Sequence, residues 1–577
     1  MKSIRTDVLV VGTGPTGLTA SIYLAKHGVN VLSISKYPGT APAPRAHITN
    51  QRTLEVFRDL EIEDQVRQVG YELSYLSNNV MVTSMAGLEI GRYRSYGTGP
   101  DRLSEYALAS PCPAANCQQH VMEPVLLAEA RRLGADVRFN NELLQIEQTD
   151  NEVIARVLDR ETGIEYSVHA AYAIGADGGR STVADQLEFK FTGEAGLKGM
   201  ASSWLEVDLT QYAAHRPGII YWTSPAGDQT ASWTTVTPFT EWLFVHPWPT
   251  NQEKPSEEIV LQKARRSIGD PEIPIRIRHI STWQVNNVVA TEYQKGRVFL
   301  AGDAAHRHPP YGGLGTNTSV QDAFSLAWKL LFVLKGRAGT GLLESHTEER
   351  QPVGAQVVHR AIESFKNMAP LEDAIGLSKV TSEEEARRTL ETLFGDSPSG
   401  SERREKLAAA IKLQDYRSNA LGVDLGQRYV SRAIVSEASS FPEPETGDRE
   451  LHYRPTTHPG APLPHAWIEH EKKKLSVLDL AGHGRFTLLV GVGGEGWARA
   501  AAEVSAELGI ELAVCSVGLR CTYDDVTGDW VKVREVGDGG AILVRPDRFV
   551  AWRSMDMAKS PNSALGAALR QVLSIPA

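Results

Sequence analysis

A glycine-rich stretch from Gly302 to Asn317 constrains the fold of this chain more than any other part of its 577 residues. It follows the apolar run 297–301, which predicts a buried strand, and precedes 320–331, whose apolar spacing predicts a helix. In such a strand–turn–helix unit, backbone N–H groups and the helix N-terminus attract a negatively charged or electron-rich ligand. Asp303, at the end of the strand, can accept hydrogen bonds from ligand hydroxyls.

A second glycine turn, near the N-terminus, has the spacing of a dinucleotide-binding unit. An apolar strand leads into G-x-G-x-x-G at 12–17, which a helix over 18–27 and a strand over 29–35 follow. The first glycine permits a tight turn, the second lets the backbone approach a pyrophosphate, and the third lets helix and strand pack closely. An acidic residue usually ends the second strand, but here Ser35 and Lys36 stand there, and a serine binds ribose hydroxyls more weakly than a carboxylate.

Charge and composition exclude several classes of protein. The formal net charge of −10 argues against a nucleic-acid or anionic-membrane partner, because both require basic surface. We find no signal-peptide pattern and no apolar run long enough to span a bilayer, so we expect a cytoplasmic protein. The four cysteines form neither a C-x-x-C pair nor a zinc quartet, and His306 and His308 lie beside a proline turn; we therefore expect no metal site.

Four segments together resemble the single-component FAD-dependent aromatic hydroxylases, which are phenol hydroxylase-like group A flavoprotein monooxygenases. They are the two glycine turns, the segment 110–123 with its Q-x-x-x-E pattern, and the D-G segment 173–183, which runs from a strand into a helix. The resemblance spans essentially the whole chain and is strongest to bacterial chlorophenol hydroxylases. It implies bound FAD, NADPH or NADH as co-substrate, and O2.

Patterning and resemblance together predict an α/β (α+β) chain. It comprises a Rossmann-like FAD-binding domain, an antiparallel-sheet substrate domain and a C-terminal thioredoxin-like domain. The predicted segments are 1–70, 110–186 and 290–370 for FAD binding, 71–109 and 187–289 for the substrate sheet, 371–436 for a helical extension, 437–457 for a linker and 458–577 for the C-terminal domain. Since the last domain lacks C-x-x-C, we expect it to serve packing or homodimer formation rather than thiol chemistry.

The family's cofactor contacts can be transferred to matching positions. The resemblance implies that Asp303 holds the ribityl chain of FAD, that Arg45 and Gln119 contact the flavin and its phosphates, and that Asp177 and Gly178 are associated with both FAD and the nicotinamide dinucleotide. The residues predicted to bind the cofactor are Gly12, Gly14, Pro15, Thr16, Gly17, Ser35, Lys36, Arg45, Gln119, Asp177, Gly178, Gly302, Asp303, Pro309, Gly313, Leu314, Gly315 and Asn317.

His47 is the candidate catalytic residue. It stands where yeast-type phenol hydroxylases carry an aspartate, and it either abstracts the phenol proton or positions the phenol. The region 187–290 alternates polar and apolar residues and carries many aromatics, so one face of its sheet is expected to cover the flavin while most tryptophans pack in the core. The candidates for lining the substrate pocket are Tyr221, Trp222, Trp233, His246 and Pro310.

The resemblance implies hydroxylation of a phenol, ortho to its hydroxyl, through a C4a-hydroperoxyflavin formed with NAD(P)H and O2. Two alternatives remain open on the same scaffold. One is a tailoring oxygenase that hydroxylates or epoxidises a polycyclic aromatic natural product. The other is an FAD-binding interaction protein without turnover. Breadth of the pocket distinguishes a phenol hydroxylase from a tailoring oxygenase. Substrate-stimulated NAD(P)H consumption distinguishes both enzymes from an interaction protein without turnover.

Overall fold

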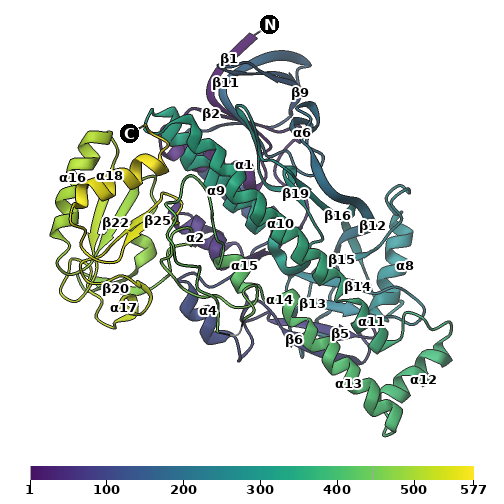
Figure 1. Ribbon diagram of the computed structural model, residues 1–577. Coiled ribbons are helices and arrows are strands. Elements are labelled where there is room, and N and C mark those ends of the chain that lie inside the picture. Colours follow the sequence, from purple (N-terminus) through teal and green to yellow (C-terminus); the bar gives the residue numbers. More distant parts are fainter. Residues whose placement is uncertain (1, 446, 577) are drawn as a thin grey trace.

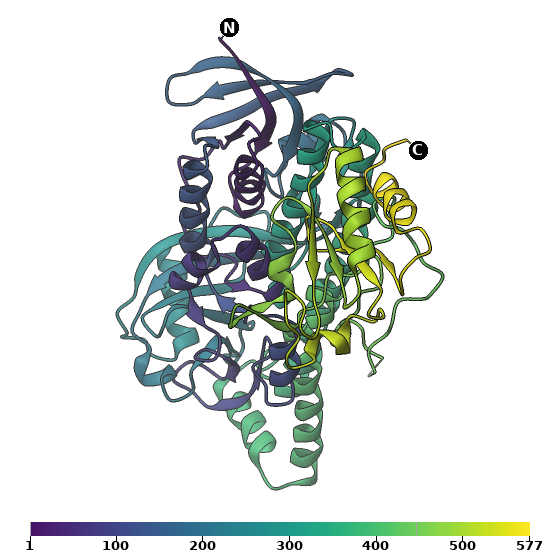
Figure 2. The same ribbon diagram turned by 90° about the vertical axis from the view of Figure 1, so that its left-hand side faces the viewer.

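The computed structural model describes residues 2–445 and 447–576, and in these residues two large sheets and a smaller C-terminal domain lie side by side (Figure 1). A helical hairpin projects from the end opposite the N-terminus (Figure 2). None of the helices described is long and apolar enough to cross a lipid bilayer.

The first eight-stranded sheet carries the N-terminal glycine turn. Its strands are β17 (Gln294–Lys295), β18 (Val298–Leu300), β11 (Ile164–Gly175), β1 (Lys2–Val11), β2 (Val31–Ile34) and β8 (Asp136–Arg138) in spatial order, with β10 (Val153–Asp159) and β9 (Asn141–Gln148) branching from β11. The five strands from β18 to β8 are parallel. Their carboxyl ends therefore share one edge, where sheets of this kind bind ligands.

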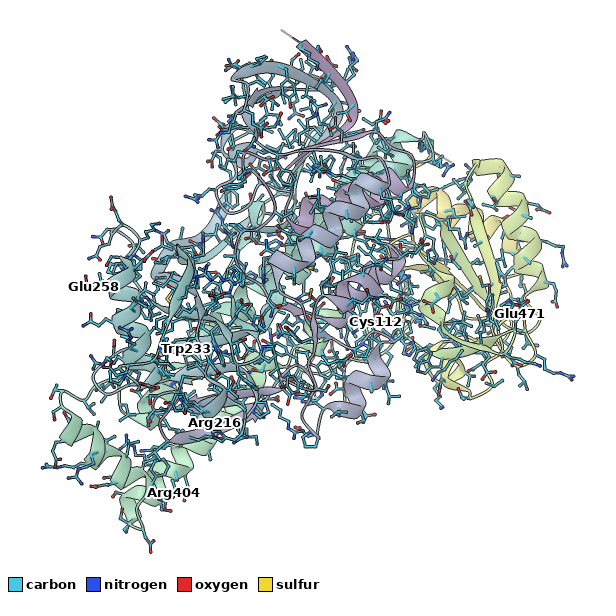
Figure 3. All side chains as sticks on the ribbon, turned by 180° about the vertical axis from the view of Figure 1, so that it is seen from behind. Cys112, Arg216, Trp233, Glu258, Arg404 and Glu471 are labelled. Atoms are coloured by element: carbon cyan, nitrogen blue, oxygen red, sulfur yellow. The ribbon has the colours of Figure 1, made fainter. Side chains whose placement is uncertain are left out.

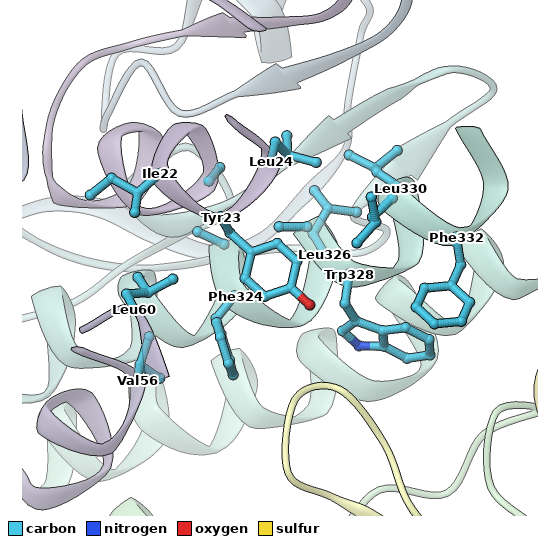
Figure 4. Packing of buried hydrophobic residues seen from close by; sticks show 14 of the residues in the cluster. Ile22, Tyr23, Leu24, Val56, Leu60, Phe324, Leu326, Trp328, Leu330 and Phe332 are labelled. Carbon is cyan, nitrogen blue, oxygen red and sulfur yellow. The ribbon is translucent and has the colours of Figure 1, made fainter. Parts of the chain in front are cut away.

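Helices α1 (Pro15–Lys26), α5 (Gln119–Arg132) and α9 (Leu314–Leu334) belong to one hydrophobic core with this sheet. In that core the ring of Tyr23 meets the ring of Phe324 edge to face, with centroids 5.4 Å apart (Figure 4). Helix α5 begins at Gln119 and continues through Pro124. The predicted dinucleotide-binding unit is confirmed as a strand–turn–helix–strand.

The second eight-stranded sheet is the predicted substrate sheet. Its order is β19 (His306–Arg307), β16 (Arg276–Ala290), β12 (Phe191–Glu206), β15 (Glu241–Pro247), β14 (Ala231–Thr237), β13 (Gly218–Thr223), β5 (Asn78–Val82) and β6 (Glu89–Arg94). One side is covered by α8 (Glu257–Ile268). The sheet is mixed rather than antiparallel, because the hairpin of β5 and β6, from an earlier part of the chain, adds to β13 in the parallel sense.

Between the second sheet and the C-terminal domain the chain is mainly helical. The helices are α10 (Ser345–Lys366), α11 (Ala369–Ile375), α12 (Glu383–Phe394), α13 (Pro398–Leu413), α14 (Asp415–Ser418) and α15 (Leu421–Leu425). Helix α10 continues through Pro352. The charged segment 382–413 forms a helical hairpin, because Gly395 is extended, Ser397 caps α13 and Pro398 starts it.

The C-terminal domain has the predicted thioredoxin-like arrangement. Its sheet is ordered β23 (Leu512–Ser516), β22 (Phe486–Val490), β24 (Ala541–Val544) and β25 (Val550–Ser554), with α16 (Glu495–Leu508) and α18 (Pro561–Val572). The pair β22 and β23 is parallel, and the other pairs are antiparallel. All four cysteines are free thiols.

A buried group of charges joins this domain to the first. On α10, Glu349 accepts hydrogen bonds from Lys329 of α9 at 2.6 Å and from Arg545 of the C-terminal domain at 2.5 Å. Arg545 also pairs with Asp547 at 2.6 Å, and all four side chains are buried. We call these four residues the interdomain charge cluster.

The remaining elements are short. They are α2 (Gln51–Asp59), α3 (Glu63–Gln68), α4 (Leu103–Ala109), α6 (Thr182–Gln186), α7 (Thr210–Ala213), α17 (Asp529–Val533), β3 (Ile48–Thr49), β4 (Tyr71–Glu72), β7 (Ala115–Asn116), β20 (Trp467–His470), β21 (Lys473–Ser476) and the 3-10 turns η1 (Gly302–Ala304), η2 (Tyr311–Gly313), η3 (Thr340–Glu344) and η4 (Val477–Leu480).

Candidate active site

The ends of β1, β11 and β18 bring three sequence motifs together. Val11 is in register with Gly175, and Gly175 with Leu300. Gly12 has φ +113°, and a Cβ there would lie 2.1 Å from the carbonyl oxygen of Ala176. Only glycine fits this close approach of the two turns, which fixes the start of the predicted pyrophosphate site.

The N-terminus of α1 is open for a ligand. Its N-cap residue is Gly14, no side chain caps it, and Pro15 occupies the first turn. A Cβ on Gly17 would lie 1.9 Å from the carbonyl oxygen of Gly12, so the helix packs tightly on the strand. The N–H groups of the first turn and the helix dipole therefore suit a pyrophosphate.

The Gly302 turn lies directly beside this helix end. Gly302 has φ +66°, and its Cβ would meet the hydroxyl oxygen of Thr16 at 2.6 Å. Its N–H donates to Asp322 at 3.0 Å, which holds the turn against α9. The neighbouring Asp303 is exposed, and its carboxylate has no hydrogen bond or ion pair within the described residues. Asp303 is thus free to accept hydrogen bonds from a polyhydroxyl chain.

A second open helix N-terminus belongs to α9. Gly313 is its N-cap in the left-handed conformation, with φ +67° and no capping side chain. The amide of Asn317 donates to the carbonyl oxygens of Gly313 at 2.5 Å and Ile48 at 2.9 Å, and its oxygen accepts from the N–H of Asn50 at 2.9 Å. These bonds join β3 to the helix end, so the predicted residues of this turn and the segment around His47 lie together.

Gln119 and Glu123 flank the first helix end. Glu123 accepts from the amide of Gln119 at 2.6 Å and from the N–H of Ala41 at 2.5 Å. Burial raises the pKa of Glu123 despite these bonds. Arg45 is exposed on the adjoining loop, where its charge acts on Glu123. Gln119 and Glu123 both belong to the Q-x-x-x-E pattern, and a carboxylate oxygen of Glu123 lies 3.8 Å from the position of a Cβ on Gly14.

Two predicted cofactor positions are engaged in local bonds. Asp177 caps α6, since its carboxylate accepts from the Ser181 hydroxyl at 2.5 Å and from the Val183 N–H at 3.2 Å, and burial raises its pKa. Ser35 is buried, and its hydroxyl accepts from the N–H of Tyr37 at 3.3 Å. Contacts of Asp177, Gly178, Ser35 or Lys36 with a cofactor remain predictions.

His47 has an unpaired ring nitrogen in a buried position. Its carbonyl oxygen accepts from the N–H of Cys117 at 2.7 Å, whereas Nδ1 is buried without a partner in the described chain. Burial lowers the pKa of His47 to about 4, although the neighbouring side chain of Asn116 opposes this. The imidazole is therefore neutral near pH 7, which favours hydrogen bonding over retention of a phenol proton, because a phenol has a pKa of about 10.

Alternation along the second sheet separates the predicted pocket residues into two groups. The α8 face is the side that packs against α8, and the cofactor face is the opposite side. Tyr221, Trp233 and His246 point to the α8 face, where they are buried, and Figure 3 shows Trp233 within the sheet and Glu258 on the covering helix. The prediction that these three line the substrate pocket is corrected, because period-two alternation turns them away from the glycine turns.

Local bonds and one cavity confirm their placement on the α8 face. The Tyr221 hydroxyl donates to the carbonyl oxygen of Arg216 at 2.8 Å, and the Trp233 indole donates to Ser267 at 2.8 Å. His246 lines a cavity of about 410 Å³ together with Trp248. This cavity therefore lies on the far side of the sheet from the glycine turns.

The cofactor face carries half-buried side chains instead. They are Met200, Ser202, Trp204, Ile220, Trp222, Ser232, Leu243 and Val245. Trp222 stacks on Tyr311 of the glycine-rich turn with centroids 6.4 Å apart, and Trp204 meets His120, beside Gln119, edge to face at 5.2 Å. Of the predicted pocket residues, Trp222 therefore lies on this face and Pro310 is exposed beside Tyr311.

Sequence reasoning missed Tyr311 and Arg417. The guanidinium of Arg417, on α14, lies 4.1 Å from the Trp222 ring centre and 4.6 Å from that of Tyr311. Tyr311 stood inside the motif and could have been singled out as its one aromatic residue. Arg417 lies far along the chain in a segment without a motif, so no local signal marked it.

The chain is similar to enzymes and solved structures over its whole length. A family model described as "FAD binding domain" matches residues 5–361, and one described as "Aromatic-ring hydroxylase, C-terminal" matches 456–576. The chain is 42% identical to 2,4-dichlorophenol 6-monooxygenase of Delftia acidovorans over 99% of each chain. It is 41% identical to phenol 2-monooxygenase of Pseudomonas sp. (strain EST1001), over 97% of this chain and 92% of the other. The flavin-dependent monooxygenase PieE, solved with FAD and substrate, superposes with a TM-score of 0.96 at 42% identity over 100% of both chains.

Proposed function

Because this chain belongs to the family of FAD-dependent aromatic-ring hydroxylases, we propose that it hydroxylates a single-ring phenol next to its hydroxyl group, consuming NADPH or NADH and O2. The product is a catechol. The full-length likeness to 2,4-dichlorophenol 6-monooxygenase and to phenol 2-monooxygenase supports a chlorophenol or a related phenol as substrate.

One structural observation carries this proposal. Two helix N-termini without capping side chains, those of α1 and α9, flank the free carboxylate of Asp303. This arrangement fits FAD, with the pyrophosphate at α1, the ribityl hydroxyls at Asp303 and the electron-rich edge of the flavin at α9. When bound there, FAD supplies electron transfer from NAD(P)H and activation of O2, which amino-acid side chains do not provide.

The side chains of this chain would bind and orient the phenol. The neutral ring of His47 hydrogen-bonds the phenolic oxygen through Nδ1, which has no other partner in the described residues. Ile220, Leu243 and Val245, on the cofactor face, exclude water from the ring. The first-turn N–H groups of α9 stabilise negative charge that develops beside them.

Measuring NAD(P)H oxidation by the FAD-loaded protein across a panel of phenols tests this function. Catechol product and hydrogen peroxide are quantified together. We expect a single-ring phenol to stimulate oxidation, with product equal to the reductant consumed. Stimulation that yields only peroxide would indicate a larger substrate and support a tailoring oxygenase. Absence of stimulation by any aromatic compound would contradict an enzymatic role.

We further propose that the protein is a homodimer. The C-terminal domain exposes the apolar side chains of Val492 and Leu519, which are 48% and 69% accessible. Light scattering should then give twice the chain mass of 63.1 kDa. A single-chain mass at micromolar concentration would contradict the dimer.

A further inference from the structure

Arg417 lies between three parts of the molecule at the edge of the candidate site. It belongs to α14 of the helical extension, and its guanidinium contacts the rings of Trp222 on the cofactor face and Tyr311 in the glycine-rich turn. A Cβ on Gly312 would lie 3.3 Å from its carbonyl oxygen. Its side chain is therefore held beside the same turn that leads into the N-terminus of α9.

This guanidinium is a buried cation without a carboxylate partner. Arg417 is 5% exposed, and Nη1 approaches only the sulfur of Met368 at 2.6 Å and the amide oxygen of Gln414 at 3.5 Å. Nε and Nη2 donate no hydrogen bond to any residue in 2–445 or 447–576. The fork of donors that an arginine offers to an anion is therefore unused.

The other buried arginines of the described chain all pair with a carboxylate. They are Arg52 with Glu55, Arg102 with Asp415, Arg216 with Glu89, Arg350 with Asp322, Arg360 with Glu450, Arg545 with Glu349 and Arg548 with Asp59. Burying a charge is unfavourable unless an opposite charge or hydrogen bonds compensate it. Arg417 is the exception, because only the rings of Trp222 and Tyr311 meet its charge, and the counter-charge of an anionic ligand would stabilise it further.

The groups around Arg417 do not supply it. Tyr96 and Tyr311 are the titratable groups on which its charge acts, and burial raises the pKa of both hydroxyls, so they are neutral in the working range. Tyr93 acts on both tyrosines, Glu372 of α11 acts on Tyr311, and the carboxyl group of Asp424 on α15 acts on Tyr96, but none of these three forms an ion pair with Arg417 in the described residues. An anionic oxygen of the substrate is the remaining source.

We propose that Arg417 binds the ionised oxygen of the phenolic substrate and so selects the phenolate form. This inference rests on the proposed phenol hydroxylation. It also explains how the phenol can lose its proton although the neutral ring of His47, whose pKa is lowered, holds a proton poorly. The substrate O–H proton passes to water, the electron pair stays on the oxygen, and the guanidinium stabilises the resulting charge. His47 then donates a hydrogen bond to that oxygen.

The dissociation constant of the phenol that best supports turnover tests this assignment. It is measured from pH 6 to 10 by the perturbation of flavin absorbance in FAD-loaded protein without NAD(P)H. An opposite charge within hydrogen-bonding range shifts an ionisation by about 1 to 3 pKa units, so the wild type should prefer the phenolate by about tenfold or more. Arg417→Gln should abolish this preference, and Arg417→Lys should restore part of it.

Controls separate this role from a structural one. Arg404→Gln removes an exposed arginine at the tip of the helical hairpin and should leave the pH dependence unchanged (Figure 3). Flavin occupancy should be the same in all variants. If Arg417→Gln keeps the wild-type preference, the inference is wrong although phenol hydroxylation stands. Hydroxybenzoates, which carry a carboxylate on the phenol ring, are tested beside simple phenols. If Arg417→Gln weakens the binding of hydroxybenzoates alone, Arg417 recognises the ring carboxylate and the phenolate assignment fails. If the wild type hydroxylates no phenol, the proposed function fails first.

Discussion

His47 is a neutral hydrogen-bonding group at the pH where such enzymes work, because burial lowers its pKa to about 4. His47→Ala should therefore reduce kcat/KM about tenfold, the effect of one lost hydrogen bond to a reacting oxygen. The loss should be constant between pH 6 and 9, and flavin occupancy should not change. Steady-state kinetics over this range measure it.

His47→Asn is the matched variant, since its amide retains a donor and should recover part of the rate. If the reduction of kcat/KM in His47→Ala instead follows the titration curve of a single group, His47 is not neutral throughout this pH range and acts as a base.

Asp424, on α15, is a half-buried residue whose carboxyl group accepts a hydrogen bond from the amide of Asn50 at 2.6 Å. Burial raises its pKa to about 7. The folded state thus binds a proton that the unfolded chain releases near pH 4, so stability falls as the pH rises from about 4 to 7, by up to about 4 kcal/mol. Asp424→Asn should melt above the wild type at pH 8, with a smaller difference at pH 5.

Thermal melting at the two pH values checks this, with the exposed Asp396→Asn as control. Equal differences at pH 5 and pH 8 would show that Asp424 is ionised in the folded protein.

Some residues of the site follow from the sequence and others do not. Gly12 and Gly302 were predictable because glycine spacing reports backbone geometry directly. Trp222 and Tyr221 are neighbours in one strand, and only the three-dimensional sheet shows which of them faces the glycine turns. Arg417 was not predictable, because the absence of a carboxylate partner is a property of the folded chain.

At the scale of elements, the Gly302 turn joins the two large sheets. β18 ends the first sheet at Leu300, and β19 enters the second at His306. Asp322 of α9 fixes this connection between the sheets. Its carboxylate accepts hydrogen bonds from the Gly302 N–H at 3.0 Å, from His306 at 2.8 Å and from Arg350 at 2.7 Å. Burial alone would raise the pKa of Asp322, but the charges of Arg350 and His306 hold it well below its ordinary range.

Asp322→Asn should loosen this passage and weaken FAD binding, because one amide oxygen cannot replace a carboxylate with three donors. Breaking a buried pair of this kind costs about 3–5 kcal/mol. Since the native pKa is depressed, the contribution of Asp322 is present above about pH 4 and is lost as the pH falls below it.

Denaturant titrations at pH 7 and pH 3.5, followed by flavin fluorescence, measure both effects. The difference between wild type and variant should shrink at the lower pH. An unchanged midpoint at pH 7 would mean that Asp322 does not hold the turn.

Elements with a clear period were predicted well, and element breaks were not. The strand–turn–helix units at both glycine turns are confirmed. The break between α12 and α13 gives a weak signal in the sequence because the charged pattern continues on both sides, and it depends on the extended Gly395 and the cap at Ser397. The parallel addition of β5 to β13 involves distant segments and leaves no local trace.

At the scale of the whole molecule, the interdomain charge cluster fixes the C-terminal domain to α9 and α10. Burial raises the pKa of Glu349, but the charges of Arg545 and Lys329 outweigh this and lower it to about 2. Glu349→Gln should leave two buried cations poorly compensated and destabilise the protein by about 3–5 kcal/mol. Calorimetry should show the C-terminal domain unfolding separately at a lower temperature.

Glu443→Gln is the control, because Glu443 pairs with Arg428 near the surface, where an ion pair contributes about 0–1 kcal/mol. A single cooperative transition in Glu349→Gln, at the wild-type temperature, would show that apolar packing alone fixes the domain.

The order of domains was predictable from motifs, whereas the contact between them was not. Arg545 and Asp547 stood in a segment recognised only as resembling the C-terminal domain of the family. Their partners Glu349 and Lys329 lie in two other helices, where no local pattern marks these charges as buried. Burial of such charges is decided by the assembled molecule, so a single sequence gives no sign of it.

The alternation along β13 has a consequence for heredity. A substitution at Trp222 changes the face that stacks on Tyr311, whereas one at Tyr221 disturbs packing under α8. Mutations that alter the face toward Tyr311 and mutations that alter folding therefore fall in alternating codons of one short stretch of the gene. Deletion of one codon within β13 would shift the alternation by one residue and turn each following side chain to the opposite face. Deletion of two codons would keep the following side chains on their original faces.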